Sequence, residues 1–149
     1  SKRPPLDRVN ATLSFLYTIF TREYAAALES VGLDSYMGFY HSLRPGRESL
    51  ACDLVEEGRC IVERFVLTLI NLKIIKPEDF DVQVSGAVFL NDDGRKKVLS
   101  KWQEKKRTDM IHPYLKEKIP MGLLPYVQSM LLAKFVRGEI DEYPCYLVK

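Results

Sequence analysis

A long apolar pattern lies between Asp7 and Gly32, where the chain reads DRVNATLSFLYTIFTREYAAALESVG. Its apolar residues recur every three or four positions, which is the spacing of one face of an α-helix. The members of this stripe are Val9, Leu13, Leu16, Tyr17, Phe20, Tyr24, Ala27, Leu28 and Val31. Asp7 suits the N-cap of the helix and Gly32 its end. Phe15 and Ile19 add a second apolar face, so we predict that this helix lies at the centre of a bundle.

The rest of the chain predicts further helices around the first one. They are expected from Ser49 to Gly58, from there to about Leu72, from Asn91 to about Lys106, and from Pro125 to about Arg137. In the last of them, the apolar positions are Tyr126, Met130, Leu131, Ala133 and Phe135. The predicted fold class is therefore mainly α, a helical bundle with one short β-hairpin at about Val82 to Leu90, turning at Ser85-Gly86.

The segments outside these elements predict irregular structure. His112-Pro113, Pro120 and Pro125 interrupt the chain before the last helix, which favours turns and a short helix there. Beyond the last helix, the segment from Asp141 to Lys149 is expected to be extended and to fray.

Length and composition indicate a single globular domain. With 149 residues, 46% of them hydrophobic and 28% charged, the chain can bury one core and is neither disordered nor collagen-like. Its longest apolar runs, such as Met121 to Leu124, are far shorter than the roughly 20 residues of a membrane helix. Three cysteines without Cys-x-x-Cys spacing predict no disulfide framework or zinc knuckle and favour a reducing, cytoplasmic location.

Chemically active residues are concentrated between His41 and Arg59, in HSLRPGRESLACDLVEEGR. Asp53 precedes Glu56 by three residues and Glu57 by four, so carboxylates can share one face of a helix. A divalent cation would relieve their repulsion, and His41 could add a nitrogen ligand from the preceding loop. The same pattern also suits a solvated acidic surface with a structural histidine. The residues alone leave both interpretations open.

Several segments of the chain carry a family pattern. They are NATLSFLY (10–17), ALESVGLD (27–34), GFYH (38–41), RPGRESLACDLVEE (44–57) and VLTLIN (66–71). Together they resemble the helical C-terminal domain of the CRISPR-associated integrase, the metal-dependent nuclease and integrase of CRISPR adaptation. The similarity is dense over about the first half of the chain and thinner later, in FLNDDGRKK (89–97) and RGE (137–139).

The resemblance implies a catalytic metal site. It makes His41 and Glu56 ligands of Mg²⁺ or Mn²⁺ with Asp53 as the adjacent acid, and all three catalytic. The implied reaction inserts foreign DNA fragments into the CRISPR repeat array by transesterification. In the family a further glutamate ligand and an N-terminal β domain precede this region, so we expect the whole chain to be one helical catalytic domain, a C-terminal fragment. Gly58 and Cys60 depart from the family, which has an aromatic residue and a proline near these positions.

Candidate DNA contacts lie in three places. Arg44 and Arg47 could hold phosphates, because guanidinium groups match phosphate oxygens, although both could instead pair with nearby glutamates. Asn10, at the start of the first helix, could contact the site or serve as a capping residue. The basic face from Arg95 to Arg107 suits nucleic acid or plain solvent, and His112 is expected to be structural.

The family resemblance also implies partners. These are DNA, as the foreign fragment and the CRISPR repeat, a second copy in a homodimer of the full-length protein, and a small ferredoxin-like CRISPR adaptation protein. Without the β domain we expect a monomer or a weak dimer, with Phe15 and Ile19 buried in the bundle. The alternative function is a non-enzymatic helical module that binds DNA or a protein partner, its acids being only surface charge.

Overall fold

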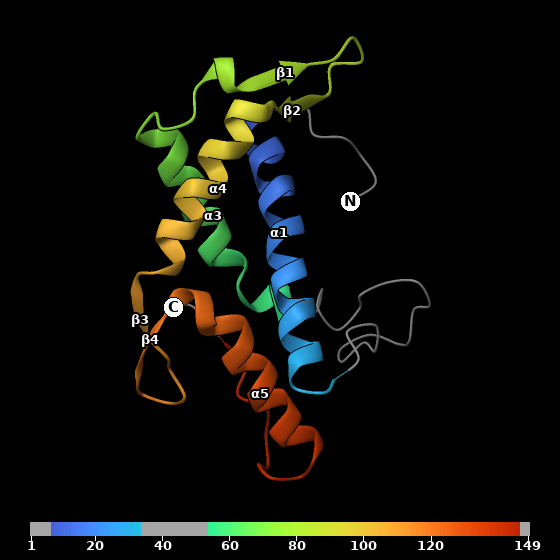
Figure 1. Ribbon diagram of the computed structural model, residues 1–149, viewed down its shortest axis with the longest axis vertical. Coiled ribbons are helices and arrows are strands. Elements are labelled where there is room, and N and C mark those ends of the chain that lie inside the picture. The colour runs from blue at the N-terminus through green and yellow to red at the C-terminus, as the bar shows by residue number, and fades with distance from the viewer. Residues whose placement is uncertain (1–6, 34–53, 147–149) are drawn as a thin grey trace.

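The computed structural model describes residues 7–33 and 54–146 (Figure 1). Its elements are α1 (Arg8–Ser30), α3 (Arg59–Asn71), η1 (Pro77–Asp79), β1 (Phe80–Val82), β2 (Val88–Leu90), α4 (Asp92–Lys106), β3 (Asp109–Ile111), β4 (Lys118–Pro120), η2 (Met121–Leu123) and α5 (Leu124–Val136). Residues 54–57 are also helical and lead into α3. The predicted class, mainly α with short β elements, is confirmed. Within the described ranges, no helix is long and apolar enough to cross a membrane.

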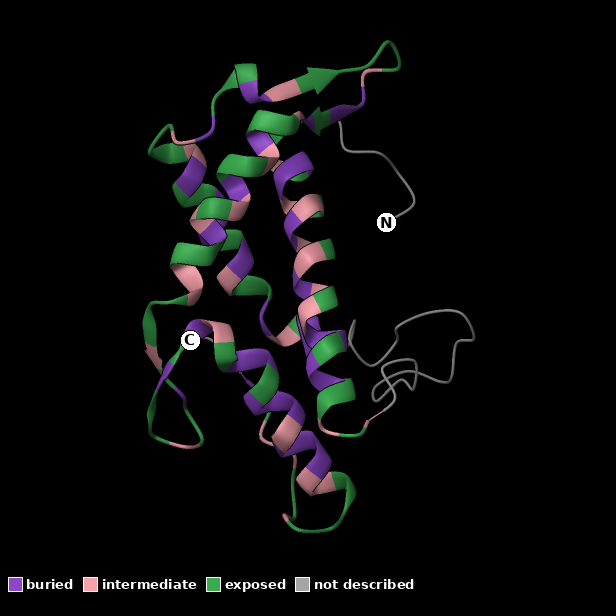
Figure 2. Ribbon diagram, viewed as in Figure 1, coloured by how far each residue is buried: buried purple, intermediate pink, exposed green. Residues whose placement is uncertain are grey.

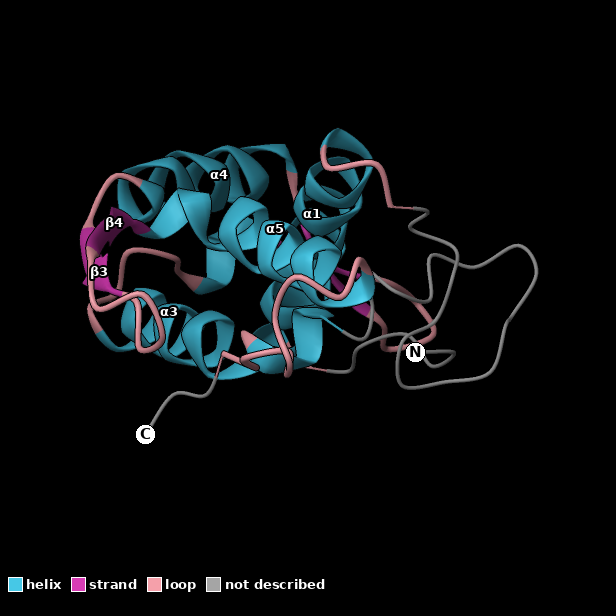
Figure 3. Cartoon of the chain, turned by 90° about the horizontal axis from the view of Figure 1, so that it is seen from below, coloured by secondary structure: helices cyan, strands magenta, loops and turns pink. Residues whose placement is uncertain are grey.

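Helix α1 runs along the bundle, with α3 and α4 beside its first half and α5 beside its second half (Figure 1). Seen from below, α1, α3 and α4 surround a shared interior (Figure 3). The predicted caps are present: the Asp7 carboxylate accepts the Asn10 N–H at 2.8 Å. At the other end Gly32 has φ +84°, a left-handed conformation that suits glycine and ends the helix. The sequence therefore predicted both ends of α1.

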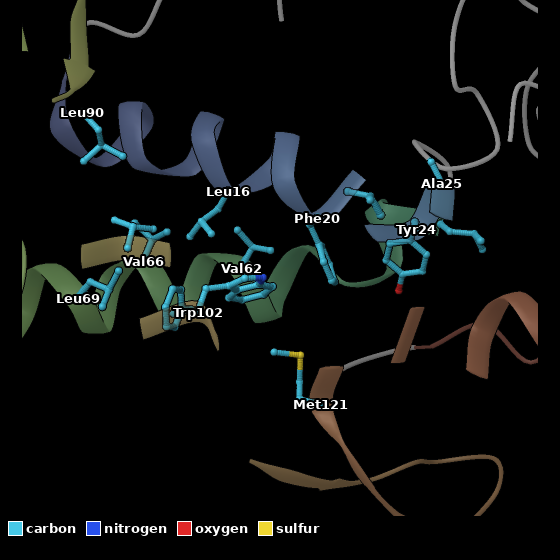
Figure 4. Close-up of a cluster of buried hydrophobic side chains, with 14 of the residues drawn as sticks. Leu16, Phe20, Tyr24, Ala25, Val62, Val66, Leu69, Leu90, Trp102 and Met121 are labelled. Carbon is cyan, nitrogen blue, oxygen red and sulfur yellow. The ribbon is translucent and has the colours of Figure 1, made fainter. Parts of the chain in front are cut away.

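The core lies between α1, α3 and α4, where the buried faces of the helices meet (Figure 2). Trp102 is fully buried and packs edge-on against Phe20, with ring centroids 5.6 Å apart (Figure 4). It also packs edge-on against Phe65, with ring centroids 5.1 Å apart. Aromatic pairs of this geometry add to the free energy gained from burial. Phe15 and Ile19, the second apolar face of α1, are partly buried and pack against the same core.

The predicted β-hairpin is confirmed, with shifted boundaries. Strand β1 pairs with β2 in antiparallel register, Phe80 opposite Leu90 and Val82 opposite Val88. The first strand thus begins before the predicted Val82. The turn contains Gly86 at φ +91°, a conformation that favours glycine.

A second hairpin, formed by β3 and β4, corrects the expectation of turns and a short helix before the last helix. Asp109 pairs with Pro120 and Ile111 with Lys118. The prolines misled the prediction, because Pro120 lies at the end of a two-stranded ladder, where a missing N–H is tolerated. Ile119, on β4, packs in a small apolar cluster with residues of α5. The described part of the chain therefore has two hairpins and not one.

Helix α5 occupies the predicted residues, and Leu131 and Ala133 are buried as predicted, but its inward face differs in part. Tyr126 was predicted to point to the core and is exposed, whereas the polar residues Gln128 and Ser129 are fully buried. The segment that follows was expected to fray, yet Tyr146 is buried and its backbone N–H is bonded to Glu57. Gln128 and Tyr146 make polar contacts with distant segments, and such contacts leave no local pattern in the sequence.

Candidate functional site

The described residues include only part of the predicted site. His41, Arg44, Arg47 and Asp53 lie outside the described residues, so their roles stay predictions. The structure places Glu56, the predicted second acidic ligand, and Asn10, the third candidate DNA contact.

Glu56 lies on the short helical stretch 54–57 and faces solvent. Its carboxylate pairs with Arg59 at 2.8 Å, one helical turn later, and both side chains are more than half exposed. An exposed pair of this kind is worth only about 0–1 kcal/mol, so an incoming cation could displace the guanidinium at little cost. Two oxygens that are exposed and weakly paired fit the donor chemistry of Mg²⁺ or Mn²⁺. Glu56 is therefore compatible with the predicted ligand role.

The residues around Glu56 fix the position of its backbone. Leu54 and Val55 are buried in the core. Gly58 lies against the ring of Phe20, where a Cβ atom would come within 2.6 Å of Cε2. The helix is interrupted at Gly58, as predicted, and the close approach of Phe20 leaves little room for a side chain there. The exposed carboxylate thus extends from a stretch that is held firmly on its other sides.

Tyr17 of α1 was predicted only as a member of the apolar stripe, but it belongs to the surroundings of Glu56. Burial raises the pKa of Tyr17 to about 12, and the nearby carboxylates of Glu63 and Glu56 add to the rise, opposed by Arg59. The phenol is therefore neutral at physiological pH. A tyrosine within an apolar stripe gives no signal that separates this position from an ordinary core position.

Asn10 is engaged in the cap of α1. Its backbone N–H and its side-chain amide both donate to the Asp7 carboxylate, at 2.8 Å each. Gly58, next to the stretch that carries Glu56, lies against Phe20, ten residues after Asn10 on α1. Ten residues of helix span about 15 Å, so Asn10 lies about that far along α1 from Gly58. The contact of Asn10 with DNA stays a prediction, and the structure supports its capping role.

The structure corrects the expectation that the carboxylate of Glu57 can share one helix face with the other acids. It is turned into the protein and accepts hydrogen bonds from the backbone N–H of Tyr146 at 2.7 Å and the hydroxyl of Tyr143 at 2.9 Å. Adjacent residues point about 100° apart around a helix, which is why Glu56 can face solvent while Glu57 faces inward. Among the described residues, no group of three or more histidine, cysteine, aspartate or glutamate side chains is placed to hold a metal ion.

The basic face of α4 is partly neutralised by acids. Lys97 pairs with the buried Asp79 at 3.0 Å, and Lys106 pairs with Glu23 at 2.7 Å. Arg107 is exposed near the end of the helix. Such pairing lowers the positive potential of the surface, so its contact with nucleic acid stays a prediction.

Comparisons with known proteins place these features in a family. The family model described as CRISPR associated protein Cas1 matches residues 1–104. The protein named CRISPR-associated endonuclease Cas1 2 from Rhodospirillum rubrum is 51% identical over 150 residues, covering 100% of this chain and 44% of that protein. CRISPR-associated endonuclease Cas1 1 from Chlorobaculum tepidum is 49% identical over 148 residues, covering 99% of this chain and 43% of that protein. The chain thus spans less than half the length of these relatives.

Solved structures share the fold. A casposase bound to an integration product matches with a TM-score of 0.87 and 24% identity, over 98% of this chain and 42% of that one. A Cas1 protein from Thermotoga maritima matches with a TM-score of 0.82 and 25% identity, over 93% of this chain and 42% of that one. The family model, the identities and the shared helical fold agree: the chain belongs to the Cas1 family of CRISPR-associated proteins.

Proposed function

We propose that this chain is the helical catalytic part of a metal-dependent DNA endonuclease and integrase of CRISPR adaptation. The observation that carries the proposal is the placement of Glu56, an exposed, weakly paired carboxylate on a firmly held helical stretch. Support also comes from relatives named CRISPR-associated endonucleases and from the fold shared with a casposase bound to an integration product.

In this proposal His41, Asp53 and Glu56 hold a divalent cation, Mg²⁺ or Mn²⁺. The cation would supply charge stabilisation for the phosphate under attack. The terminal 3′ hydroxyl of the foreign fragment attacks a phosphorus of the repeat, one P–O bond forms as another breaks, and the departing 3′ oxygen takes up a proton. Phosphodiester bonds are exchanged and not consumed, so the step needs no nucleotide cofactor. Arg44 and Arg47 would hold the phosphates in register, with Asn10 a further DNA contact.

The proposed partners are the foreign fragment, the CRISPR repeat, a second copy of the protein and a small ferredoxin-like adaptation protein. Two solved structures with this fold are described as Cas6-RT-Cas1–Cas2 complexes, at 25% identity and TM-scores of 0.78 and 0.77. The proposed location is the cytoplasm, where the repeat array lies.

Calorimetric titration of the full-length protein with Mn²⁺ tests the metal assignment. Wild-type protein should bind, and His41→Ala and Glu56→Ala should each bind at least about 10-fold more weakly, because each removes a ligand. Glu104→Gln is the matched control, since Glu104 is also an exposed glutamate paired one turn away, with Lys101. An unchanged heat signature in the double variant would remove the assignment. DNA binding that weakens steeply with salt and needs no divalent ion would then favour the non-enzymatic module.

A further inference from the structure

Glu57 is the neighbour of Glu56 and belongs to a buried polar network that joins segments distant in the sequence. Its carboxylate accepts from the backbone N–H of Tyr146 at 2.7 Å, from the hydroxyl of Tyr143 at 2.9 and 3.0 Å, and from the amide nitrogen of Gln128 at 3.2 Å. These donors come from α5 and from the chain that follows it. The stretch 54–57 is thereby tied to the C-terminal segment 143–146.

Gln128 is the centre of this network. It is fully buried on α5, and its amide nitrogen also donates to the Tyr143 hydroxyl at 2.8 Å and to the Pro144 carbonyl at 3.2 Å. Its amide oxygen lies 2.6 Å from Nε2 of His112, which is 1% exposed. One side chain therefore joins α5, the loop between β3 and β4, and the C-terminal segment.

The direction of the hydrogen bonds is fixed by the surroundings of His112. Its Nδ1 faces the backbone N–H groups of Tyr114 and Leu115, each at 3.2 Å, so Nδ1 must accept and Nε2 must carry the proton. Nε2 therefore donates to the oxygen of Gln128, which leaves the amide nitrogen to donate toward Glu57. The chain of hydrogen bonds from His112 through Gln128 ends at the carboxylate of Glu57, which can accept from several donors at once.

The donor at Tyr143 is also held in its neutral form. Burial raises the pKa of Tyr143, and the negative charge of Glu57 raises it further, so the hydroxyl keeps its proton and donates it to the carboxylate. Fully satisfied buried networks allow only one arrangement of the segments they join. A shift of the stretch 54–57 by a fraction of a turn would take the Glu57 carboxylate away from its donors on Tyr143, Tyr146 and Gln128.

We propose that Glu57 is a positioning residue, through which the C-terminal segment 143–146 and Gln128 set the orientation of the Glu56 carboxylate. The inference rests on the proposed function, in which Glu56 is a metal ligand. Glu56 and Glu57 are consecutive on one short helical stretch, so holding one carboxylate inside fixes the direction in which the other points outside. Removing a residue that orients a metal ligand from outside the coordination shell typically lowers metal affinity about 10–100-fold.

The test compares two substitutions that remove charge from an inward-facing carboxylate in the full-length protein. Glu57→Gln places an amide where several donors converge, whereas Glu23→Gln does the same on α1, where Glu23 accepts from Lys106 at 2.7 Å and Trp102 at 3.3 Å. Both should lower thermal stability, and only Glu57→Gln should weaken Mn²⁺ binding, by about 10–100-fold. The exchange Glu57→Gln with Gln128→Glu reverses donor and acceptor and should restore part of the affinity.

Equal losses of affinity in Glu57→Gln and Glu23→Gln, or no loss in either, would overturn the positioning role. A second readout needs no metal: hydrogen exchange of the amides in residues 54–58. Glu57→Gln should speed this exchange at least about 10-fold while Glu23→Gln leaves it unchanged, and equal exchange in the two variants would overturn the inference. If wild-type protein binds no Mn²⁺, the proposed function fails by itself, and the exchange measurement still decides whether Glu57 holds the stretch.

Discussion

Two parts of the interior join the helices by different means. Around Trp102, side chains from α1, α3 and α4 pack through apolar and aromatic surface, as in Figure 4. Around Glu57, the contacts between the stretch 54–57, α5 and the C-terminal segment are hydrogen bonds among buried and partly buried polar groups. The first region resembles the interior of any helical bundle, and the second lies directly behind the candidate site.

The difference indicates that the two regions contribute differently to stability and to the geometry of the site. Burial of apolar surface is non-directional and supplies most of the stability of a fold. A buried polar network adds less net free energy but accepts only one arrangement of its donors and acceptors. We therefore expect substitutions around Trp102 to lower stability most, and substitutions around Glu57 to affect the site more than stability.

The largest effect is expected from Trp102→Ala. Removing a fully buried indole that packs on Phe20 and Phe65 should cost about 3–5 kcal/mol in the free energy of unfolding. Trp102→Phe keeps much of the volume and should cost less. Denaturant unfolding measures both, and a loss below about 1 kcal/mol for Trp102→Ala would show that the aromatic region is not the main source of stability.

A smaller loss is expected from Gln128→Leu. The substitution keeps the volume but leaves Nε2 of the buried His112 without its acceptor and removes one of the donors to the Glu57 carboxylate, which should cost about 2–3 kcal/mol. Gln103→Leu, at an exposed position of α4, is the control and should change stability by less than about 0.5 kcal/mol. If Gln128→Leu stabilises the protein, the polar region around Glu57 fixes one arrangement of the segments at the expense of stability. The contrast with the apolar region around Trp102 is then larger than expected.

Gly58→Ala tests the close approach between the stretch 54–57 and α1. The added Cβ would meet the Phe20 ring at 2.6 Å, so the expected cost is about 1–3 kcal/mol. Phe20→Leu in the same chain should relieve part of this strain, giving a favourable coupling in a double-mutant cycle. Strict additivity of the two substitutions would contradict the proposed contact.

The smallest effect concerns pH and Tyr17. Because the pKa of Tyr17 rises from 10.0 to about 12 in the folded protein, the folded state holds the phenol proton more tightly than the unfolded state. This contribution is fully present below pH 10 and is lost as the pH rises toward 12. Stability should fall less steeply across this range in Tyr17→Phe than in the wild type. Parallel curves for the two proteins would place Tyr17 in an ordinary solvated environment.

The sequence predicted the parts of the fold that depend on local patterns. The stripe of α1, its Asp7 cap and its Gly32 end follow from spacing and residue type, and so does the hairpin around Gly86. The hairpin of β3 and β4 was missed, because its prolines suggest a break and its pairing is set by packing against α5.

The candidate site was predicted less completely, for a physical reason. Glu56 and Glu57 are the same residue type at adjacent positions. Glu57 faces inward because it is bonded to residues 71 to 89 positions later in the sequence, whereas Glu56 is exposed. A single sequence without those contacts makes both carboxylates equally suitable as ligands. The burial of Gln128 on α5 was missed for the same reason.

Strand transfer by the full-length protein with its adaptation partner tests the central proposal most directly. A labelled DNA fragment with a free 3′ hydroxyl is incubated with a plasmid that carries the repeat, in Mn²⁺ or in EDTA. Wild-type protein and Glu104→Gln should join fragment to plasmid only in Mn²⁺, and Glu56→Ala should reduce the joined product at least about 100-fold, because it removes a ligand of the catalytic cation. Joining in EDTA, or undiminished joining by Glu56→Ala, would contradict the account.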